Sequence, residues 1–312
     1  MAAIVFVFPG QGSQYVGMGK ELAERYPEAA AVFQEAAAAL GRPLEQLCFY
    51  GPAADLTRTE NTQPAVLTVS IACYQVLAAR GIRPAAVAGH SLGEYSALVA
   101  AGSLSFSDAV RLVEKRAQFM AAAVPAGQGG MVAILGLEAA KVDALCREVR
   151  EGTAEAANLN APGQVVVAGD QQGLTAISSL ARAAGAKRVI PLQVSGPFHS
   201  RLMALAAQQL AEVIAKVELA APRIPLVANA TADYSRTAAE VRENLIKQVA
   251  SPVRWQESIE RLLNDGCRTF IEVGPGDVLS GLIKRTSRQA VTARVDNIQT
   301  LEKTLAILQE GN

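Results

Sequence analysis

The chain has 312 residues, of which 29 are basic and 29 acidic, so its formal net charge is zero. Half of the residues are hydrophobic, which excludes an intrinsically disordered chain, and the balanced charge argues against a charge-driven nucleic-acid binder. The two histidines, His90 and His199, lie far apart in the sequence, so a histidine-based metal site is not expected.

The first third of the chain predicts strands that alternate with helices. A buried strand at 3–8 leads into a tight loop at 9–14. This apolar stretch stops at Pro9 and has no basic segment, so a strand fits it better than a signal peptide. The elements that follow are expected as helices at 18–25, 28–40 and 62–79 (with Thr62 as N-cap), a strand at 85–89, and helices ending near 101 and 122.

The middle of the chain follows a different pattern after a glycine-rich break at 127–130. We expect strand 131–135, helix 138–150, strands 154–159 and 164–168, helix 171–184 and strand 187–192. This βαββαβ order is typical of a small ferredoxin-like unit. We therefore predict a subdomain at 127–195 that interrupts a large domain made of 1–126 and 196–312.

The remaining third returns to alternating helices and strands. The expected elements are a helix near 200–216, a strand near 225–229, helices at 238–249 and 255–265, a strand at 268–273, and helices near 277–286 and 298–309. Such alternation predicts an α/β fold whose largely parallel sheet is covered on both faces.

The cysteines and the apolar segments suggest a cellular location. Cys48, Cys73, Cys146 and Cys267 are scattered without a CxxC pair, and we expect free thiols. No apolar run reaches the ~18 residues that a membrane span requires. We therefore expect a cytoplasmic protein without a membrane partner.

Residues 89–93, Gly-His-Ser-Leu-Gly, match the pattern G-x-S-x-G. This pattern forms a sharp turn between a strand and a helix, with the serine at its tip and glycines that allow close packing. The expected strand before the motif and helix after it supply that context. Ser91 is therefore the candidate nucleophile, and the free N–H groups of the helix would face the reacting carbonyl. The alternative is a serine that only caps the helix.

A serine nucleophile needs a base, and the sequence offers two histidines. His90 adjoins Ser91, and its side chain should point away from the nucleophile at such a turn. His199 lies in a loop-like stretch between a strand and a helix, where active-site residues of α/β proteins are often found. His199 is therefore the candidate base, and no orienting carboxylate is evident.

Several further segments carry a resemblance to a known family. They are Phe-Pro-Gly-Gln-Gly-Ser-Gln at 8–14, Thr-Gln-Pro-Ala at 62–65, Gly-His-Ser-Leu-Gly-Glu-Tyr-Ser-Ala-Leu at 89–98, Arg-Leu-Val-Glu-Lys-Arg at 111–116, Asn-Ala-Pro-Gly-Gln-Val-Val at 160–166, Gly-Pro-Phe-His-Ser at 196–200, Ser-Pro-Val-Arg-Trp at 251–255 and Glu-Val-Gly-Pro-Gly at 272–276. In this order they resemble the malonyl-CoA:acyl carrier protein transacylases of bacterial type II fatty-acid synthesis, relatives of polyketide acyltransferase domains. The resemblance implies an α/β-hydrolase-like core interrupted by the ferredoxin-like subdomain.

The resemblance also implies roles for particular residues. Ser91 falls on the acylated serine and His199 on its base. Gln11 and Leu92 fall on the residues whose backbone N–H groups form the oxyanion hole. Arg116 falls on the arginine that binds the malonyl carboxylate, for which a planar guanidinium is suited.

Three more residues receive expected roles. Gln248 falls where the family orients the histidine through a backbone carbonyl, and Asn160 falls on a pocket residue of the subdomain. Either of these two could instead only satisfy a turn. Phe198, directly before the base, should crowd an α-methyl group, and Leu92 is also compatible with malonyl rather than methylmalonyl.

The resemblance implies ping-pong transfer of a malonyl group from malonyl-CoA to holo acyl carrier protein for fatty-acid biosynthesis. It implies no metal or redox cofactor, and we expect a monomer. Carrier proteins are acidic, so a local basic patch should receive them. The pairs 187–188 and 284–285, each Lys-Arg, are candidates, although such pairs more often serve as solvated surface.

Three alternatives stay open from the sequence. A discrete acyltransferase could serve a polyketide synthase with the same residues. A serine esterase or thioesterase could use the same turn and base, but it has no reason to keep Arg116. A non-catalytic module that binds carrier proteins would not need Ser91 and His199 together.

Overall fold

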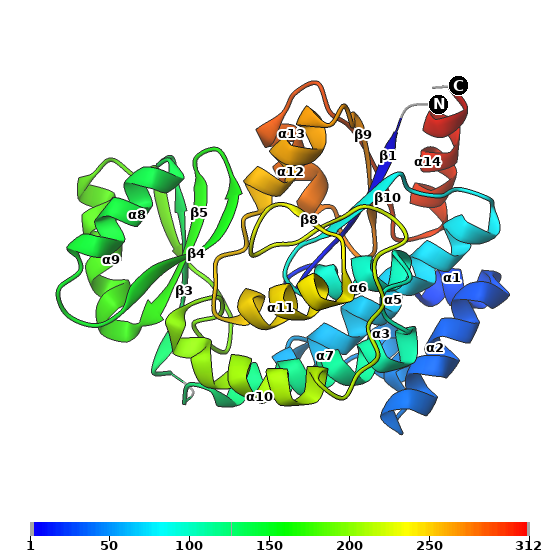
Figure 1. Cartoon of the computed structure of the whole chain (residues 1–312), viewed down its shortest axis with the longest axis horizontal. Coiled ribbons are helices and arrows are strands. Elements are labelled where there is room, and N and C mark those ends of the chain that lie inside the picture. The colour runs from blue at the N-terminus through cyan, green and yellow to red at the C-terminus, as the bar shows by residue number, and fades with distance from the viewer. Residues whose placement is uncertain (1–2, 126, 311–312) are drawn as a thin grey trace.

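A six-stranded sheet forms the centre of the larger part of the molecule (Figure 1). The structure is a computed structural model and describes residues 3–125 and 127–310. The strands run in the order β10-β9-β1-β2-β7-β8. Their bounds are β1 Ile4–Phe8, β2 Ala86–Gly89, β7 Leu226–Val227, β8 Tyr234–Ser235, β9 Thr269–Val273 and β10 Val291–Val295. All neighbours pair in parallel except β8, which is antiparallel to β7, so the largely parallel sheet is confirmed.

Strand β1 shows why this sheet is covered on both faces. Phe6 and Phe8 pack into one apolar cluster, whereas Val5 and Val7 pack into a second cluster on the opposite face. Successive side chains of a strand point to opposite faces, so a strand that is apolar throughout needs cover on both.

Helices supply this cover. The Val5 face is covered by α12 (Trp255–Asn264) and α13 (Val278–Thr286). The helices that contribute to the other cluster are α1 Lys20–Arg25, α2 Pro27–Leu40, α3 Leu44–Tyr50, α4 Ala53–Leu56, α5 Thr59–Ala79, α6 Gly93–Ala100, α7 Phe106–Ala122, α10 Ala204–Ile214, α11 Ala238–Val249 and α14 Ile298–Glu310. A short 3₁₀ turn at Arg201–Met203 precedes α10.

Helix α5 is the central helix of the larger cluster. It begins at Thr59, three residues earlier than expected, so Thr62 is not its N-cap; the Thr62 hydroxyl instead donates to the backbone oxygen of Leu56. Among the described residues, α5 is the one helix long and apolar enough to cross a membrane by length and composition. Of its most apolar window, 78% is buried inside the protein, as expected for a helix in a core.

A second, four-stranded sheet contains residues from the middle of the chain. Its order is β4-β5-β3-β6, and every neighbouring pair is antiparallel. The elements are β3 Gly129–Leu135, α8 Ala139–Glu148, β4 Ala154–Ala161, β5 Gln164–Asp170, α9 Gln171–Ala183 and β6 Arg188–Pro191. This is the βαββαβ order expected from the sequence.

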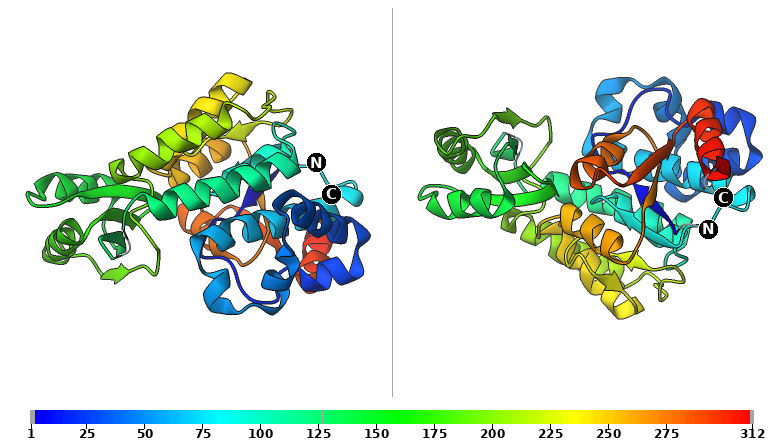
Figure 2. Two further views of the ribbon diagram at one scale, coloured as in Figure 1. Left: turned by 90° about the horizontal axis from the view of Figure 1, so that it is seen from below. Right: turned by 90° about the horizontal axis from the view of Figure 1, so that it is seen from above.

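The two faces of this second sheet differ. Val132, Ile134 and Val165 pack with α8 and α9 into a separate small core. Met131 and Val166 point to the other face and join the large core. Figures 1 and 2 show this unit projecting from one end of the molecule, with α2 and α14 toward the opposite end.

Some elements and boundaries differ from the sequence-based expectations or remain predictions. Helices α3 and α4 and strands β8 and β10 were not predicted, because each is short or, like β10, lies at an edge with an exposed first residue. The division into 1–126, 127–195 and 196–312 stays a prediction, and its boundary at residue 126 and the chain ends lie outside the described residues.

Candidate active site

The turn that carries Ser91, called the nucleophile turn because Ser91 is the predicted nucleophile, lies where β2 ends and α6 begins. Ser91 has a φ of 52°, a left-handed conformation that is unfavourable for a residue with a side chain. A Cβ atom on Gly89 would lie 1.9 Å from the backbone oxygen of Gly93, and one on Gly93 would lie 2.0 Å from that of Phe8. Both flanking positions therefore require glycine, which explains the G-x-S-x-G pattern.

The Ser91 hydroxyl lies within hydrogen-bond distance of His199. The distance between Ser91 Oγ and His199 Nε2 is 2.7 Å, and His199 Nδ1 lies 2.8 Å from the backbone oxygen of Gln248. A carbonyl oxygen only accepts, so Nδ1 carries the hydrogen and Nε2 presents its lone pair to the serine. Among the described residues, no carboxylate bonds to this imidazole, so the two side chains form a dyad.

The surroundings of His199 favour its neutral form. Its side chain is buried, and burial together with the nearby charge of Arg116 lowers its pKa to about 3. His199 also has a positive φ, 60°. A neutral imidazole at neutral pH is the protonation state that a general base needs.

Arg116 comes from α7 and is only 1% exposed, unlike the solvated arginine common on helices. Its Nη1 donates to Gln63 Oε1 at 2.6 Å, and its Nη2 donates to Gln248 Oε1 at 2.9 Å. The same Nη2 lies 3.1 Å from Ser91 Oγ. The Nε is buried on the side of Tyr95, so the guanidinium faces the cavity through Nη2, the atom closest to the Ser91 hydroxyl.

Gln11 and Leu92 border the same cavity as the dyad. This cavity holds about 100 Å³, and Ser91, Arg116 and His199 also line it. Within the described part of the chain, no acceptor is found for the backbone N–H of Gln11 or of Leu92. Two free amides beside a nucleophile can stabilise a developing oxyanion.

The other predicted residues take different positions. Phe198 is buried and lines the cavity directly before His199 in the chain. Asn160 is buried in β4, and its Oδ1 lies 2.8 Å from His90 Nε2. Asn158, two positions earlier, lines the cavity. The His90 ring thus points away from Ser91, toward Asn160 and the ring of Trp255.

Further polar residues belong to the site but received no role from the sequence. Gln63 and Glu94 lie within the segments at 62–65 and 89–98, and both are buried. Glu94 Oε2 accepts hydrogen bonds from Gln248 Nε2 and from the backbone N–H of Asn229. Asn229 is fully buried, and its only sequence signal is a polar residue after a short apolar run.

Comparison with known proteins identifies the family. The family model described as an acyl transferase domain matches residues 5–305. The chain belongs to the acyl transferase family. It is 50% identical to the malonyl CoA-acyl carrier protein transacylase of Bacillus subtilis, over 100% of this chain and 99% of that protein. It is 48% identical to the protein of the same name in Escherichia coli K12, covering 91% and 93% of the two chains.

Solved structures of this family share the whole fold. FabD from Acinetobacter baumannii superposes with a TM-score of 0.96 at 42% identity, covering 100% of both chains. A malonyl-transacylase solved in complex with AntF, a type II polyketide acyl carrier protein, gives a TM-score of 0.95 at 41% identity, again over 100% of both. The α/β fold and the acyltransferase class expected from the resemblance are therefore confirmed.

Proposed function

We propose that this acyltransferase moves a malonyl group from malonyl-CoA to the phosphopantetheine thiol of acyl carrier protein, through a malonyl ester on Ser91. The observation that carries the site assignment is the arrangement around one hydroxyl. Ser91 Oγ lies 2.7 Å from the neutral base His199 and 3.1 Å from the buried cation Arg116. The names of the relatives support the substrate class.

In the first half-reaction, His199 Nε2 takes the proton of Ser91 as the serine oxygen attacks the thioester carbonyl. The amides of Gln11 and Leu92 stabilise the oxyanion. The carbon–sulfur bond breaks, and the proton on His199 passes to the leaving CoA thiolate. In the second half-reaction the carrier-protein thiol gives its proton to His199 and its sulfur attacks the malonyl ester. The bond between the ester carbon and Ser91 Oγ then breaks, and His199 returns the proton to the serine oxygen.

Arg116 explains the preference for an acyl group with a free carboxylate. Its charge is buried and its Nη2 lies beside the cavity, where a charge-assisted hydrogen bond to a carboxylate is strong because the surroundings are of low dielectric constant. Phe198 restricts the space beside the base, which favours malonyl over a branched acyl group. A serine esterase would gain nothing from a buried arginine at this position.

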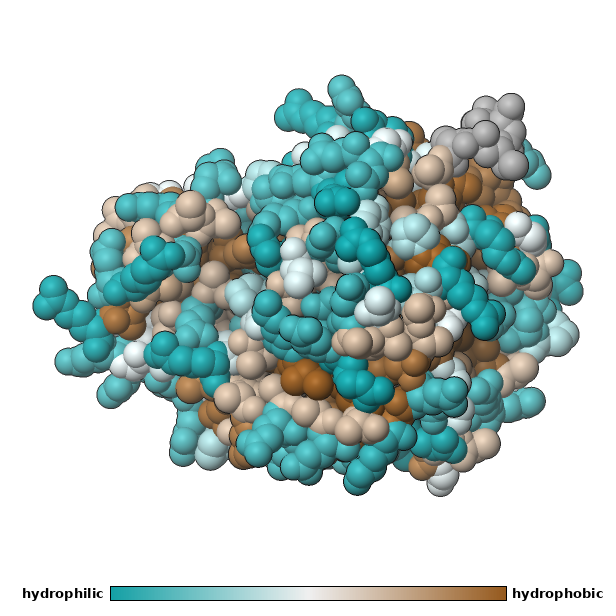
Figure 3. Space-filling view, viewed as in Figure 1, coloured by the Kyte–Doolittle hydropathy of each residue, from teal (hydrophilic) through white to brown (hydrophobic). Residues whose placement is uncertain are grey.

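The reaction as proposed uses no metal or redox cofactor, because the nucleophile, base and oxyanion donors are all supplied by the chain. The partners are malonyl-CoA and acyl carrier protein, and we infer a cytoplasmic monomer. Lys187, Arg188 and Arg285 border one cavity of about 400 Å³, so parts of both candidate basic pairs lie together. Hydrophilic residues cover much of the face of the molecule in view in Figure 3.

A second pathway assignment has a specific observation in its favour. The structure with AntF shows a relative, 41% identical over its full length, bound to a polyketide carrier protein. The chemistry is the same for either carrier. The two uses are therefore separated by comparing how fast a fatty-acid carrier protein and a polyketide carrier protein discharge the malonyl adduct. We propose fatty-acid synthesis as the main use.

Intact-mass analysis after mixing with malonyl-CoA tests the proposal. We expect one malonyl adduct on Ser91 that a holo carrier protein discharges, and none on Ser91→Ala. No adduct on the native chain would remove the transferase assignment. Rapid loss of the adduct to water without a carrier would indicate a hydrolase.

A further inference from the structure

One side chain holds the nucleophile turn on both sides of Ser91. Asn229 Oδ1 accepts from the backbone N–H of Ser91 at 2.6 Å, and Asn229 Nδ2 donates to the backbone oxygen of Gly89 at 2.6 Å. A backbone in the left-handed region costs roughly 1–3 kcal/mol and persists only where its surroundings impose it. The Asn229 amide supplies two of the bonds that impose it.

Asn229 is itself fixed in the interior. Its backbone N–H donates to Glu94 Oε2 at 3.0 Å, and the same carboxyl oxygen accepts from Gln248 Nε2 at 2.7 Å. All three residues are no more than 1% exposed. Glu94 is the ionisable side chain in direct contact with Asn229 among the described residues, while Arg116 and His199 contact Gln248.

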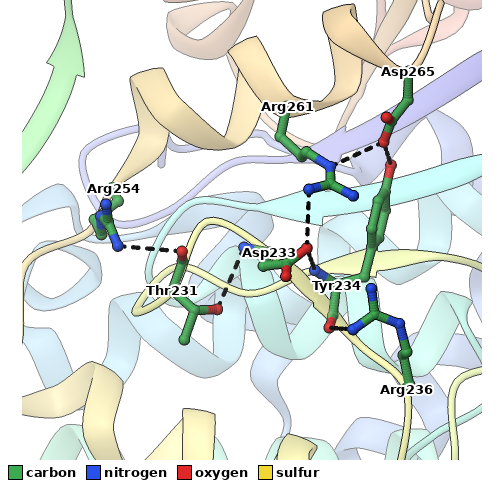
Figure 4. Close-up of polar contacts among 7 residues, drawn as sticks. All are labelled: Thr231, Asp233, Tyr234, Arg236, Arg254, Arg261 and Asp265. Atoms are coloured by element: carbon green, nitrogen blue, oxygen red, sulfur yellow. Dashed lines mark hydrogen bonds and ion pairs between the residues drawn. The ribbon is translucent and has the colours of Figure 1, made fainter.

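The loop that carries Asn229 is bonded to α12 and to the residues that cap this helix. Arg254 donates to the backbone oxygen of Thr231 at 3.2 Å, and Arg261 pairs with Asp233 at 3.4 Å. The Tyr234 hydroxyl donates to Asp265 at 2.7 Å, and Figure 4 shows how these side chains lie. The backbone N–H of Arg254 also donates to the oxygen of Asn229 at 3.0 Å.

This loop contains a strained residue of its own, in the same left-handed conformation as Ser91. Ala232 has a φ of 54°, and in the described part of the chain Ser91, His199 and Ala232 are the non-glycine residues with positive φ. Two of them are the nucleophile and base of the proposed reaction. The third lies three residues after Asn229, in the tight turn that places it.

The direction of the Leu92 amide follows from the same contacts. In a trans peptide the oxygen of Ser91 and the N–H of Leu92 point in opposite directions. The Ser91 oxygen is held by Gln248 Nε2 at 3.0 Å and by the Glu94 N–H at 3.1 Å. The Ser91 N–H is occupied by Asn229, so the Leu92 N–H is the amide left facing the cavity.

We propose that Asn229 is a positioning residue that holds Ser91 and the Leu92 amide in the reactive geometry. This inference rests on the proposed function, because its effect is on formation of the acyl-serine. Removing the amide leaves the turn free to relax, which moves both the nucleophile and an oxyanion donor. The loss should fall on the acylation rate constant, while KM for malonyl-CoA changes little.

Asn229→Ala is the first test, with Thr231→Ala as the matched control. Thr231 lies in the same loop and accepts from the backbone N–H of Asp233, but it does not contact the turn. Single-turnover malonylation, followed by intact mass, should slow about 10²-fold in Asn229→Ala, as for other small displacements of reacting groups. Thr231→Ala should stay within ~3-fold. A native rate in folded Asn229→Ala, or equal losses in both variants, contradicts the proposal.

Asn229→Asp provides a second test, which can still be used if the alanine variant folds poorly. A protonated carboxyl repeats the donor and acceptor pattern of the amide, whereas a carboxylate cannot donate to the Gly89 oxygen. The acylation rate of Asn229→Asp should therefore rise as pH falls. This rate is divided by that of the native chain in the same buffers, so that the titration of Glu94, which affects both chains, is accounted for. No relative recovery overturns the positioning role.

A fluorophosphonate probe separates this proposal from the proposed function. The probe reacts with activated serines without needing malonyl recognition. If the native chain forms no malonyl adduct, the proposed function fails, yet labelling of Ser91 still reports the geometry of the turn. Equal labelling rates in native protein and Asn229→Ala would then overturn the positioning role alone.

Discussion

The two sheets contribute to the active site in different ways. Ser91, Leu92, Gln11, Arg116 and His199 all come from segments around the parallel sheet. The antiparallel sheet and the loop after it contribute cavity walls, namely Met131, Asn158, Leu192 and Val194. The reacting groups on the parallel sheet are fixed by buried hydrogen bonds, whereas the wall is mostly apolar. This difference predicts that changes in the first region alter the rate and changes in the second alter binding.

The largest effect is expected for His199→Ala. Removing the base from Ser91 should slow acylation by ~10²–10⁴-fold, the range usual for a positioned general base. Single-turnover intact mass with saturating malonyl-CoA measures this directly. His90→Ala is the control, because His90 bonds to Asn160 rather than to the nucleophile. A larger loss in His90→Ala than in His199→Ala would reverse the assignment of the base.

Arg116→Ala should change selectivity more than overall reactivity. A hydrogen bond to a charged group contributes about 1.5–3 kcal/mol, so kcat/KM for malonyl-CoA should fall ~10–10²-fold further than kcat/KM for acetyl-CoA. Both values are obtained from the same assay with the two thioesters. Arg111→Ala, an exposed position on the same helix, should leave the ratio unchanged. Equal losses for both thioesters would show that Arg116 does not bind the carboxylate.

Leu192→Ala tests the wall contributed by the second region. Leu192 lines the cavity and is 36% exposed, so its removal takes away only part of an apolar contact. We expect KM for malonyl-CoA to rise ~3–10-fold with the acylation rate constant within ~3-fold. Leu205→Ala, an exposed leucine of α10, serves as control. A loss mainly in the rate constant would mean that the wall also positions reacting groups.

Local sequence patterns could predict the fold and part of the candidate site. Strand and helix periodicity indicated both sheets, and a local motif with few histidines indicated Ser91 and His199. Arg116 looked like a surface residue, because an arginine on an amphipathic helix usually is, and only the resemblance indicated a site role. Asn229 could not be found, since its contact with Ser91 joins residues 138 positions apart. Such contacts depend on tertiary packing, which local patterns do not encode.

The smallest effect concerns stability rather than rate, and it involves Glu94, buried beneath the nucleophile turn. Burial raises the pKa of Glu94 to about 7, so the folded chain holds this proton more tightly than the unfolded chain does. Stability from this group is therefore present below the ordinary carboxyl pKa and is lost as pH rises toward 7. His199 acts in the opposite direction, because its lowered pKa removes stability as pH falls below its ordinary value.

Glu94→Gln should remove the first of these contributions. A glutamine resembles the protonated glutamate and still offers an oxygen to Asn229 and Gln248. The variant should come closest to the native chain near pH 4.5 and exceed it at pH 8 by on the order of 1 kcal/mol, seen as a rise of ~1–3 °C in Tm. The exposed Glu212 of α10, changed to Gln, should shift neither value. An equal change at both pH values would mean that Glu94 stays ionised in the folded protein, and that the buried network around the nucleophile holds a full charge.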